Sequence, residues 1–256
     1  MHKTRPDPIT PKNTVERIHP EHFRTREKYL LYLRHVFAYE YAVARAKPTD
    51  AALEIGCGDG YGTARLAAAV ASIDAVDVDR ETVEYAARKH GSSTCRIRHY
   101  DGDRLPFEDQ TFDLVVAMQV IEHVDDDRQF LIEAWRVLKP GGLLLLTTPN
   151  RTHRVPDGQE PWNPFHVREY SPDELSSLQR GVFPGARVLG IHGSTEARRI
   201  EVARVRRGWS LRRLLPESLK LWIDGDVTRR YDLDDFFVAE HDVASSLDLL
   251  GECIRT

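Results

Sequence analysis

A run of ten residues, LEIGCGDGYG from Leu53 to Gly62, constrains the fold of this chain more than any other stretch. Four glycines stand at alternate positions, directly after an apolar segment and directly before one with helical character. The nicotinamide-binding pattern G-x-G-x-x-G fails, because its third glycine would fall on Tyr61 or Thr63. A Walker phosphate loop fails as well, since no Gly-Lys-Ser/Thr follows. The run therefore predicts a backbone loop for a ligand that presents neutral or zwitterionic groups.

Short apolar runs alternate with helix-like segments through the middle of the chain. The expected strands are residues 51–55, 73–78, 95–99, 112–118 and 142–148, and the expected helices are residues 62–70, 80–90 and 127–138. The last of these helices opens on three aspartates and stops at a Pro-Gly-Gly sequence. Because strands joined through helices form right-handed crossovers, the pattern predicts a doubly wound α/β fold with a mostly parallel sheet.

The segments on either side of this core are less regular. Residues 1–20 are expected to be a flexible lead, and residues 23–46 carry apolar side chains at helical spacing. A long proline-rich loop at 148–172 is typical of a lid or a binding loop. Beyond it we expect a helix at 172–180, strands at 186–191 and 236–240, and a helix at 243–253, while residues 200–205 fit a strand or a helix equally. We assign residues 21–256 to one domain, with a core at 50–150 and covering segments at 149–171 and 194–232.

Charge and cysteine content narrow the class of protein. With 36 Lys and Arg against 40 Asp and Glu, the formal charge of -4 gives no basic field that would attract DNA. Cys57, Cys95 and Cys253 show neither a paired framework nor a metal-ligand spacing, which favours a reducing compartment. No signal peptide is recognisable, and no apolar run approaches the roughly 20 residues of a membrane span. We expect a cytoplasmic protein that binds neither DNA nor a membrane.

Further motifs follow the glycine run in a fixed order. A second strand ends on Asp77, LPF and FD follow within residues 105–113, and EHV and LKPGG follow within residues 122–142. Together these motifs resemble the class I S-adenosylmethionine-dependent methyltransferases over about residues 50–150. The resemblance implies a Rossmann-like sheet of seven strands with an antiparallel seventh strand, which residues 236–240 would supply. It also implies S-adenosylmethionine as the cofactor.

The same resemblance assigns residues to the cofactor. Glu54 and the glycine-loop backbone would hold the amino-acid end, Asp77 the ribose and Asp101 the adenine. The complete set is Glu54, Gly56, Cys57, Gly58, Gly60, Asp77, Val78, Asp101, Gly102 and Gln119. An acid about twenty residues after the glycines is also the usual reader of ribose hydroxyls, which supports Asp77 independently. An ordinary tight turn would explain the glycines but not the later motifs.

The acceptor side is expected after the fourth strand and in the loop after residue 148. A hydroxyl acceptor needs a base or a metal to remove its proton, and the candidate bases are His123 and His166. The sequence also resembles metal-dependent O-methyltransferases that modify the terminal ribose of small RNAs or ubiquinone precursors. That resemblance implies Glu122, His123 and His166 as ligands of Mg²⁺, Mn²⁺ or Zn²⁺, although Gln119 replaces the family's first glutamate. Either histidine could instead hold the loop through a hydrogen bond.

The sequence predicts the acceptor only as a class. Our first hypothesis is an O-methyltransferase acting on a small molecule, a saccharide, as in similar actinobacterial enzymes. A quinone, a phenol, another small metabolite and the ribose of RNA are alternatives within the same reaction. A non-catalytic cofactor-binding module is the alternative from another class. A homodimer is left open.

Overall fold

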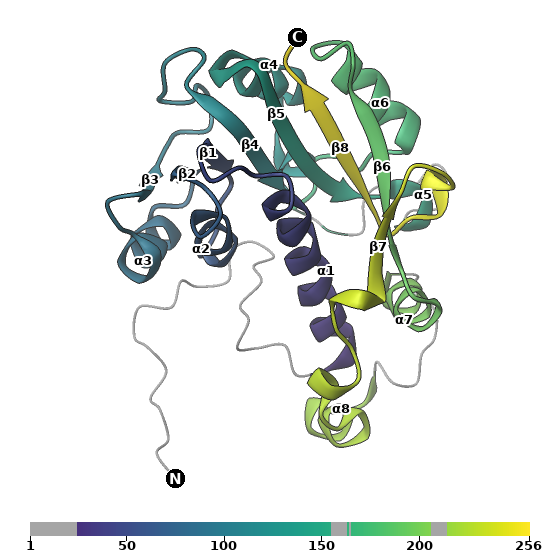
Figure 1. Ribbon diagram of the computed structural model, residues 1–256. Coiled ribbons are helices and arrows are strands. Elements are labelled where there is room, and N and C mark those ends of the chain that lie inside the picture. Colours follow the sequence, from purple (N-terminus) through teal and green to yellow (C-terminus); the bar gives the residue numbers. More distant parts are fainter. Residues whose placement is uncertain (1–24, 155–162, 164, 206–213) are drawn as a thin grey trace.

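The structure is a computed structural model that describes residues 25–154, 163, 165–205 and 214–256. The expected lead at 1–20 and parts of both covering segments lie outside these described residues. One eight-stranded sheet runs through the molecule in the order β3-β2-β1-β4-β5-β8-β6-β7 (Figure 1). Its strands are Ala51–Ile55 (β1), Ser72–Asp77 (β2), Cys95–His99 (β3), Phe112–Met118 (β4), Leu138–Pro149 (β5), Arg187–Gly193 (β6), Phe236–Ala239 (β7) and Asp248–Ile254 (β8).

Helices connect and cover these strands. Within the described residues they are Arg26–Val43 (α1), Tyr61–Ala67 (α2), Arg80–His90 (α3), Asp127–Val137 (α4), Arg151–Arg154 (α5), Pro172–Arg180 (α6), Thr195–Val205 (α7) and Glu217–Asp224 (α8). Strands β1 to β5 are all parallel, and α2, α3 and α4 form crossovers between them. The Rossmann-like doubly wound α/β class predicted from the sequence is therefore confirmed.

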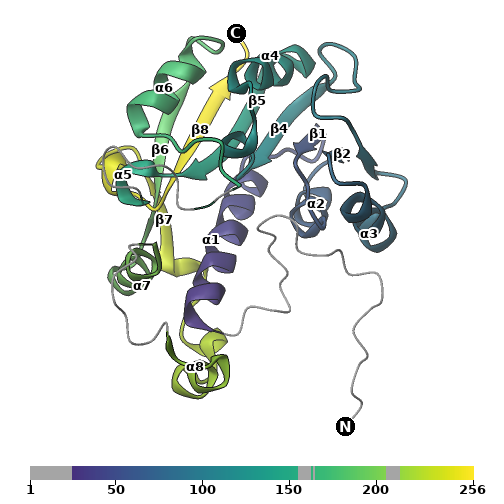
Figure 2. The ribbon, with the colours of Figure 1, turned by 180° about the vertical axis from the view of Figure 1, so that it is seen from behind.

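The two faces of the sheet bury alternate residues of the same strand. In β4, Leu114 and Val116 belong to a core that includes side chains of α1 and α2. Val115 and Ala117 belong to a second core that includes side chains of α4 and α6. Figures 1 and 2 show α1, α2 and α3 over one face and α4 and α6 over the other. Because both faces are covered, the parallel strands are continuous apolar runs, which is why the sequence reveals them.

Side chains at the helix starts explain why these helices begin where they do. The Asp79 carboxylate accepts the backbone N–H of Thr82 at 2.7 Å, and the Asp126 carboxylate accepts that of Gln129 at 2.9 Å. Ser171 and Glu174 form a reciprocal capping box at the start of α6. Each contact satisfies an N–H that the first turn of a helix leaves without an intrahelical partner. The aspartates at 125–127, which predicted a helix start, do stand at the start of α4, with Asp126 as its N-cap and Asp127 as its first residue.

The C-terminal part of the sheet differs from the prediction. Residues 243–253 were expected to form a helix, but β8 runs from Asp248 to Ile254, antiparallel to both β5 and β6. The predicted strand at 236–240 does form, as β7, but it pairs only with β6 at the edge of the sheet. Thus β8 is the antiparallel strand next to the parallel set, and the sheet has eight strands rather than seven. A strand buried on both sides need not alternate apolar residues with exposed polar ones, and the polar residues of β8, Asp248 and Glu252, are themselves buried.

A third core joins α1 to the segment between β6 and β7. Leu30 and Leu33 of α1 pack with Ala197 and Ile200 of α7. Residues 200–205, which fitted a strand or a helix equally, are helical. A buried ion pair between Arg34 of α1 and an Asp248 oxygen of β8, at 2.8 Å, adds a polar link. Among the helices of the described residues, none combines the length and apolarity needed to cross a membrane.

Candidate active site

A cavity of about 640 Å³ opens at the carboxyl ends of β1, β2 and β4. Its walls come from the glycine loop, the end of β2, the segment after β3, the segment after β4 and the start of α4. His35 and Tyr39 of α1 and Phe165 of the loop after β5 complete the lining. Doubly wound sheets bind ligands at this edge, where neighbouring crossovers diverge.

The glycine loop adopts a backbone that other residues rarely accept. Gly56, Gly58 and Gly60 have φ angles of 75°, 53° and 80°. A Cβ on Gly56 would lie 2.5 Å from a methyl group of Val120, whereas a Cβ on Gly58 would meet nothing within 4 Å. The alternating glycines thus serve two purposes, since Gly56 permits a close approach and Gly58 leaves open space at the cavity wall.

The end of β2 and the segment after β3 form one side of the cavity. The Asp77 carboxylate accepts the backbone N–H groups of Gly58 at 2.9 Å and Asp79 at 3.0 Å. Val78, which is 56 % exposed, lies beside Gly102, and both line the cavity together with Asp101. The structure therefore brings together the residues predicted for the ribose and the adenine.

Glu54 does not occupy the predicted place. It is fully buried, does not line the cavity, and accepts hydrogen bonds from Tyr39 Oη at 2.6 Å and Thr63 Oγ1 at 2.5 Å. Burial, only partly offset by these two hydrogen bonds, raises the pKa of the Glu54 carboxyl to about 7. The prediction of direct contact with the cofactor does not fit this position. Glu54 instead supports the glycine loop from beneath by joining it to α1 and α2.

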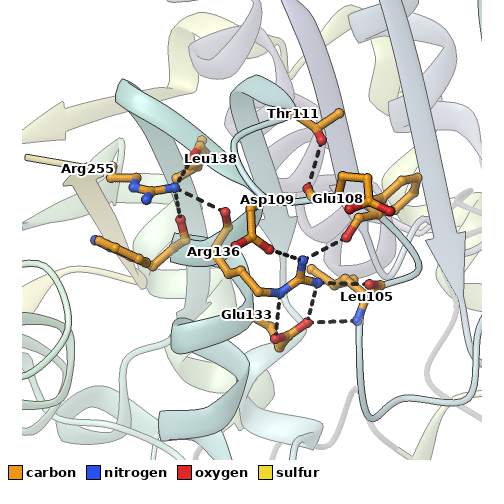
Figure 3. A network of polar contacts seen from close by, with 10 residues as sticks. Leu105, Glu108, Asp109, Thr111, Glu133, Arg136, Leu138 and Arg255 are labelled. Carbon is orange, nitrogen blue, oxygen red and sulfur yellow. Dashed lines mark hydrogen bonds and ion pairs between the residues drawn. The ribbon is translucent and has the colours of Figure 1, made fainter.

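A network around Arg136 holds the segment that follows Asp101. The Arg136 guanidinium donates to the carbonyls of Leu105 at 2.9 Å and Phe107 at 2.7 Å, and to Glu133 (Figure 3). A Glu133 oxygen also accepts the Leu105 N–H at 3.0 Å. Leu105 and Glu133 both line the cavity, so α4 fixes this part of the wall. Sequence reasoning found the LPF motif but not the arginine that holds it.

Gln119 stands just past β4 in a strained backbone conformation. Its φ is 58°, a region that residues other than glycine seldom occupy, and its side-chain amide donates to Thr147 Oγ1 at 3.2 Å. It lines the cavity, as predicted for a residue beside the methionine part of the cofactor. Such strain persists where the surrounding structure enforces it, often at a ligand site.

The two candidate histidines have different relations to the cavity. His123 lines it, and its Nδ1 lies 2.8 Å from the carbonyl oxygen of Phe165. His166 is not among the lining residues, its side chain is 3 % exposed, and its ring meets that of His123 edge-on at 4.9 Å. Only His123 is thus placed to touch a substrate directly. His166 lies behind it.

Glu122, His123 and His166 each offer one ligand atom, and these atoms lie within 4.8 Å of one another. Glu122 is buried, with one oxygen accepting from Thr148 Oγ1 at 3.0 Å. A carboxylate and two imidazoles at this separation fit a divalent cation chemically. Gln119 adds no negative charge to the cluster because its side chain is a neutral amide, and the Nε2 of this amide donates to Thr147 Oγ1. The metal site therefore stays a prediction that the geometry permits.

Several lining residues carry no sequence signal that identifies them. His35 and Tyr39 lie in an amphipathic helix before the glycine run, where they read as part of a helical pattern. Asp125 and Asp126 were noticed as a helix start but not as a cavity wall, and Gln129 was not noticed. The aspartates preceding α4 were a usable clue, because a helix that follows a central strand starts at the ligand-binding edge.

Comparison with known proteins identifies the family. A family model described as a methyltransferase domain matches residues 53–146. A probable S-adenosylmethionine-dependent methyltransferase of Mycolicibacterium smegmatis is 34 % identical over 258 residues, which cover 97 % of this chain and 95 % of the relative. The chain belongs to the S-adenosylmethionine-dependent methyltransferases. S-adenosylmethionine is accordingly the cofactor of this methyltransferase, and the cavity described above fits it.

Other relatives share parts of the methyltransferase. A ubiquinone biosynthesis O-methyltransferase of Roseobacter denitrificans is 34 % identical over 146 residues, or 50 % of this chain and 57 % of that protein. A solved methyltransferase structure from Thermotoga maritima, described as a possible histamine N-methyltransferase, aligns with a TM-score of 0.58. The alignment covers 90 % of this chain and 95 % of that one, at 21 % identity, so it supports the fold alone.

Proposed function

We propose that this methyltransferase methylates a hydroxyl group of a neutral, polyhydroxylated small molecule, a saccharide. The observation that carries this proposal is the position of His123, an imidazole at the cavity wall beyond the cofactor loop. An alcohol is a poor nucleophile at neutral pH unless a nearby group takes its proton. The Mycolicibacterium relative extends over almost the whole chain but its name does not specify an acceptor.

The hydrogen bond of His123 defines what its ring can do. The Phe165 carbonyl can only accept, so Nδ1 carries the proton and Nε2 of the neutral ring carries a lone pair. Nε2 can therefore take the hydroxyl proton as the acceptor oxygen bonds to the methyl carbon. The cofactor supplies an activated methyl group, and its sulfur keeps the electrons of the broken S–CH₃ bond. His123 and the lining residues orient the hydroxyl for this in-line transfer.

The charge of the cavity supports a neutral acceptor. Its lining includes eight carboxylate residues, and among the described lining residues there is no lysine or arginine. Phosphate-bearing acceptors such as nucleic acids would be repelled there, because like charges at short range raise the free energy of binding. Hydroxyl groups of a polyol, in contrast, can donate to these carboxylates.

An isotope experiment tests the proposal. The purified chain is incubated with cofactor bearing a deuterated methyl group and with saccharide and polyol fractions, and products are analysed by mass spectrometry. We expect the label in a methyl ether of a polyol. The His123→Ala variant, run in parallel, should transfer little label. Labelling of a nitrogen, or of phosphate-rich RNA with a strong salt dependence, would contradict the proposal.

A phenol or quinol acceptor is the second candidate. It is favoured by the similarity of half the chain to a ubiquinone biosynthesis O-methyltransferase. A phenol ionises near pH 10, far more readily than an alcohol, and so depends less on a base. A small effect of His123→Ala on turnover of a phenolic substrate, with no polyol turnover in the wild type, would favour this acceptor.

A metal-assisted form of the reaction is supported by the cluster of Glu122, His123 and His166. A divalent cation held there would lower the pKa of a hydroxyl close to it, as metals do for bound water. In that form His123 serves as a ligand rather than as a base. A chelator should then abolish activity and Mn²⁺ should restore it, whereas full activity in chelator would exclude this form.

We also propose a cytoplasmic location. All three cysteines are buried free thiols, and burial raises the pKa of the Cys57 thiol well above its usual value, which makes it unreactive.

A homodimer stays a proposal, which sedimentation of the purified chain would test.

A further inference from the structure

Glu169 is a buried acid directly behind the acceptor side of the cavity. Its side chain is 0 % exposed, although its neighbours Val167 and Arg168 are exposed. Moving a carboxylate from water into the protein interior costs on the order of several kcal/mol, as for each ion of a buried ion pair. Hydrogen bonds or opposite charges must compensate for this cost. The loop thus keeps an acid inside at a position where a neutral residue would pack more easily.

The contacts of this acid fix the proton on His166. Asn163 Oδ1 accepts the backbone N–H of Phe165 at 3.1 Å, so its Nδ2 is the group that faces His166 Nε2 at 2.8 Å. An amide N–H can only donate, and Nε2 must therefore be the acceptor nitrogen. The proton consequently lies on Nδ1, which donates to Glu169 Oε1 at 2.7 Å.

We propose that Glu169 is a positioning residue for the acceptor side. It holds His166 as the Nδ1–H tautomer, so that Nε2 keeps the lone pair that can bind a divalent cation together with Glu122 and His123. Carboxylates commonly fix metal-binding histidines in this way and make them more basic. Asn163 donates to the same lone pair and would give way to the cation. This inference rests on the metal-assisted form of the proposed function.

Contacts of neighbouring residues hold the backbone of this segment in place. The role of Glu169 in orienting His166 can therefore be tested separately from the folding of the loop. The Val167 N–H donates to the carbonyl of Glu122 at 2.8 Å. Arg168 and Tyr170 both donate to Asp127, at 2.7 Å and 2.9 Å. A change at Glu169 should therefore alter His166 while these contacts keep the loop on α4.

The first test measures Mn²⁺ binding to the purified full chain by electron paramagnetic resonance. Glu169→Gln keeps the size of the side chain but removes its charge, and it should weaken Mn²⁺ binding about 10- to 100-fold. Asp173→Asn, at an exposed acid in the first turn of α6, is the matched control and should bind Mn²⁺ like the wild type. Cofactor affinity should be unchanged in both variants. Wild-type Mn²⁺ affinity in Glu169→Gln would overturn the proposal.

The second test reads the tautomer itself and needs no metal. In ¹⁵N NMR of the chain with labelled histidine, His166 should show the Nδ1–H form in the wild type. In Glu169→Ala, checked for folding by its melting temperature, the population should move toward the Nε2–H form. An unchanged tautomer would overturn the proposal. If the wild type bound no Mn²⁺ but the tautomer moved, the metal-assisted reaction would fail while the positioning role stood.

Discussion

The side of the cavity proposed for the cofactor (the cofactor half) and the side proposed for the acceptor (the acceptor half) are built in different ways. The cofactor half comes from three successive strand–loop units, and its residues Gly56, Asp77 and Asp101 stand directly at strand ends or just beyond. The acceptor half combines α1, the segment after β4 and the loop after β5, which are far apart in sequence. The first half is formed by the backbone at successive strand ends, which the side chains of Asp77 and Arg136 hold, and the second by contacts between segments that are far apart in sequence. Substitutions should therefore affect the two halves separately.

The largest expected effect belongs to the acceptor half. His123→Ala should lower turnover about 100- to 10,000-fold, because proton removal from the acceptor is lost. Cofactor affinity, measured by calorimetry, should stay unchanged, since His123 lies beyond the residues of the cofactor half. His241→Ala, at an exposed histidine outside the cavity lining, is the control. Equal loss of turnover and cofactor binding would show that the halves are not separable.

The next effect belongs to the cofactor half and should appear in folding as well. Gly56→Ala should reduce the free energy of unfolding by about 2–4 kcal/mol, from left-handed strain and from the contact with Val120. Cofactor binding should fall with it. Gly58→Ala adds strain alone, because its Cβ would meet no atom within 4 Å, and should cost about 1–2 kcal/mol. Urea unfolding measures both, and equal losses would show that Val120 yields.

The buried carboxyl beneath the glycine loop should make stability depend on pH. The pKa of Glu54 is about 7 in the folded chain, against an ordinary value of 4.5. The folded state thus holds the proton more tightly than the unfolded chain, and this difference stabilises the fold. The stabilisation is complete below about pH 4.5 and is lost as pH rises through about 7. The Glu54→Gln variant lacks this loss. The free energy of unfolding of the variant, relative to that of the wild type, should therefore be about 2–3 kcal/mol higher at about pH 8 than at about pH 5. A constant difference between the two proteins in urea unfolding would contradict this.

The smallest of the four main effects concerns the Asp77 carboxylate of the cofactor half, which also accepts the backbone N–H groups of Gly58 and Asp79. Asp77→Ala should weaken cofactor binding by about 1.5–3 kcal/mol, because a charged acceptor of hydrogen bonds is removed. Turnover at saturating cofactor should change much less. Asp103→Ala, at an exposed acid of the same cavity, should leave affinity near the wild-type value. Unchanged binding in Asp77→Ala would mean that the ribose lies elsewhere.

These two halves also differ in how far the sequence reveals them. The glycine run and Asp77 could be found because local backbone demands place them next to strands that are visible as apolar runs. Glu54 was found, but its full burial away from the cavity lining could not be read from a motif. His35, Tyr39 and Glu169 were missed, because their roles arise only when distant segments pack.

The fold shows the same division. All five parallel strands were predicted, and four lie close to their predicted positions. β5 begins at Leu138, four residues before the predicted start, because the Pro-Gly-Gly sequence lies within the strand and not ahead of it. The segment DLLGECI was taken for a helix because a strand inserted between β5 and β6 is buried on both faces, including its acids Asp248 and Glu252. Its pairing partners lie up to about a hundred residues away, and no local pattern encodes such pairing.

The position of β8 has a consequence for the newborn chain. Synthesis delivers β6 and β7 before β8, yet both reach β5 only through β8. While the ribosome is still adding residues 248–254, strands β1 to β5 can already pair with one another, but the outer edge of β5 has no partner strand. Unpaired edges of this kind invite association with other chains, and partly made chains are the usual clients of chaperones. Closing that edge is therefore a late, long-range step in the folding of the chain.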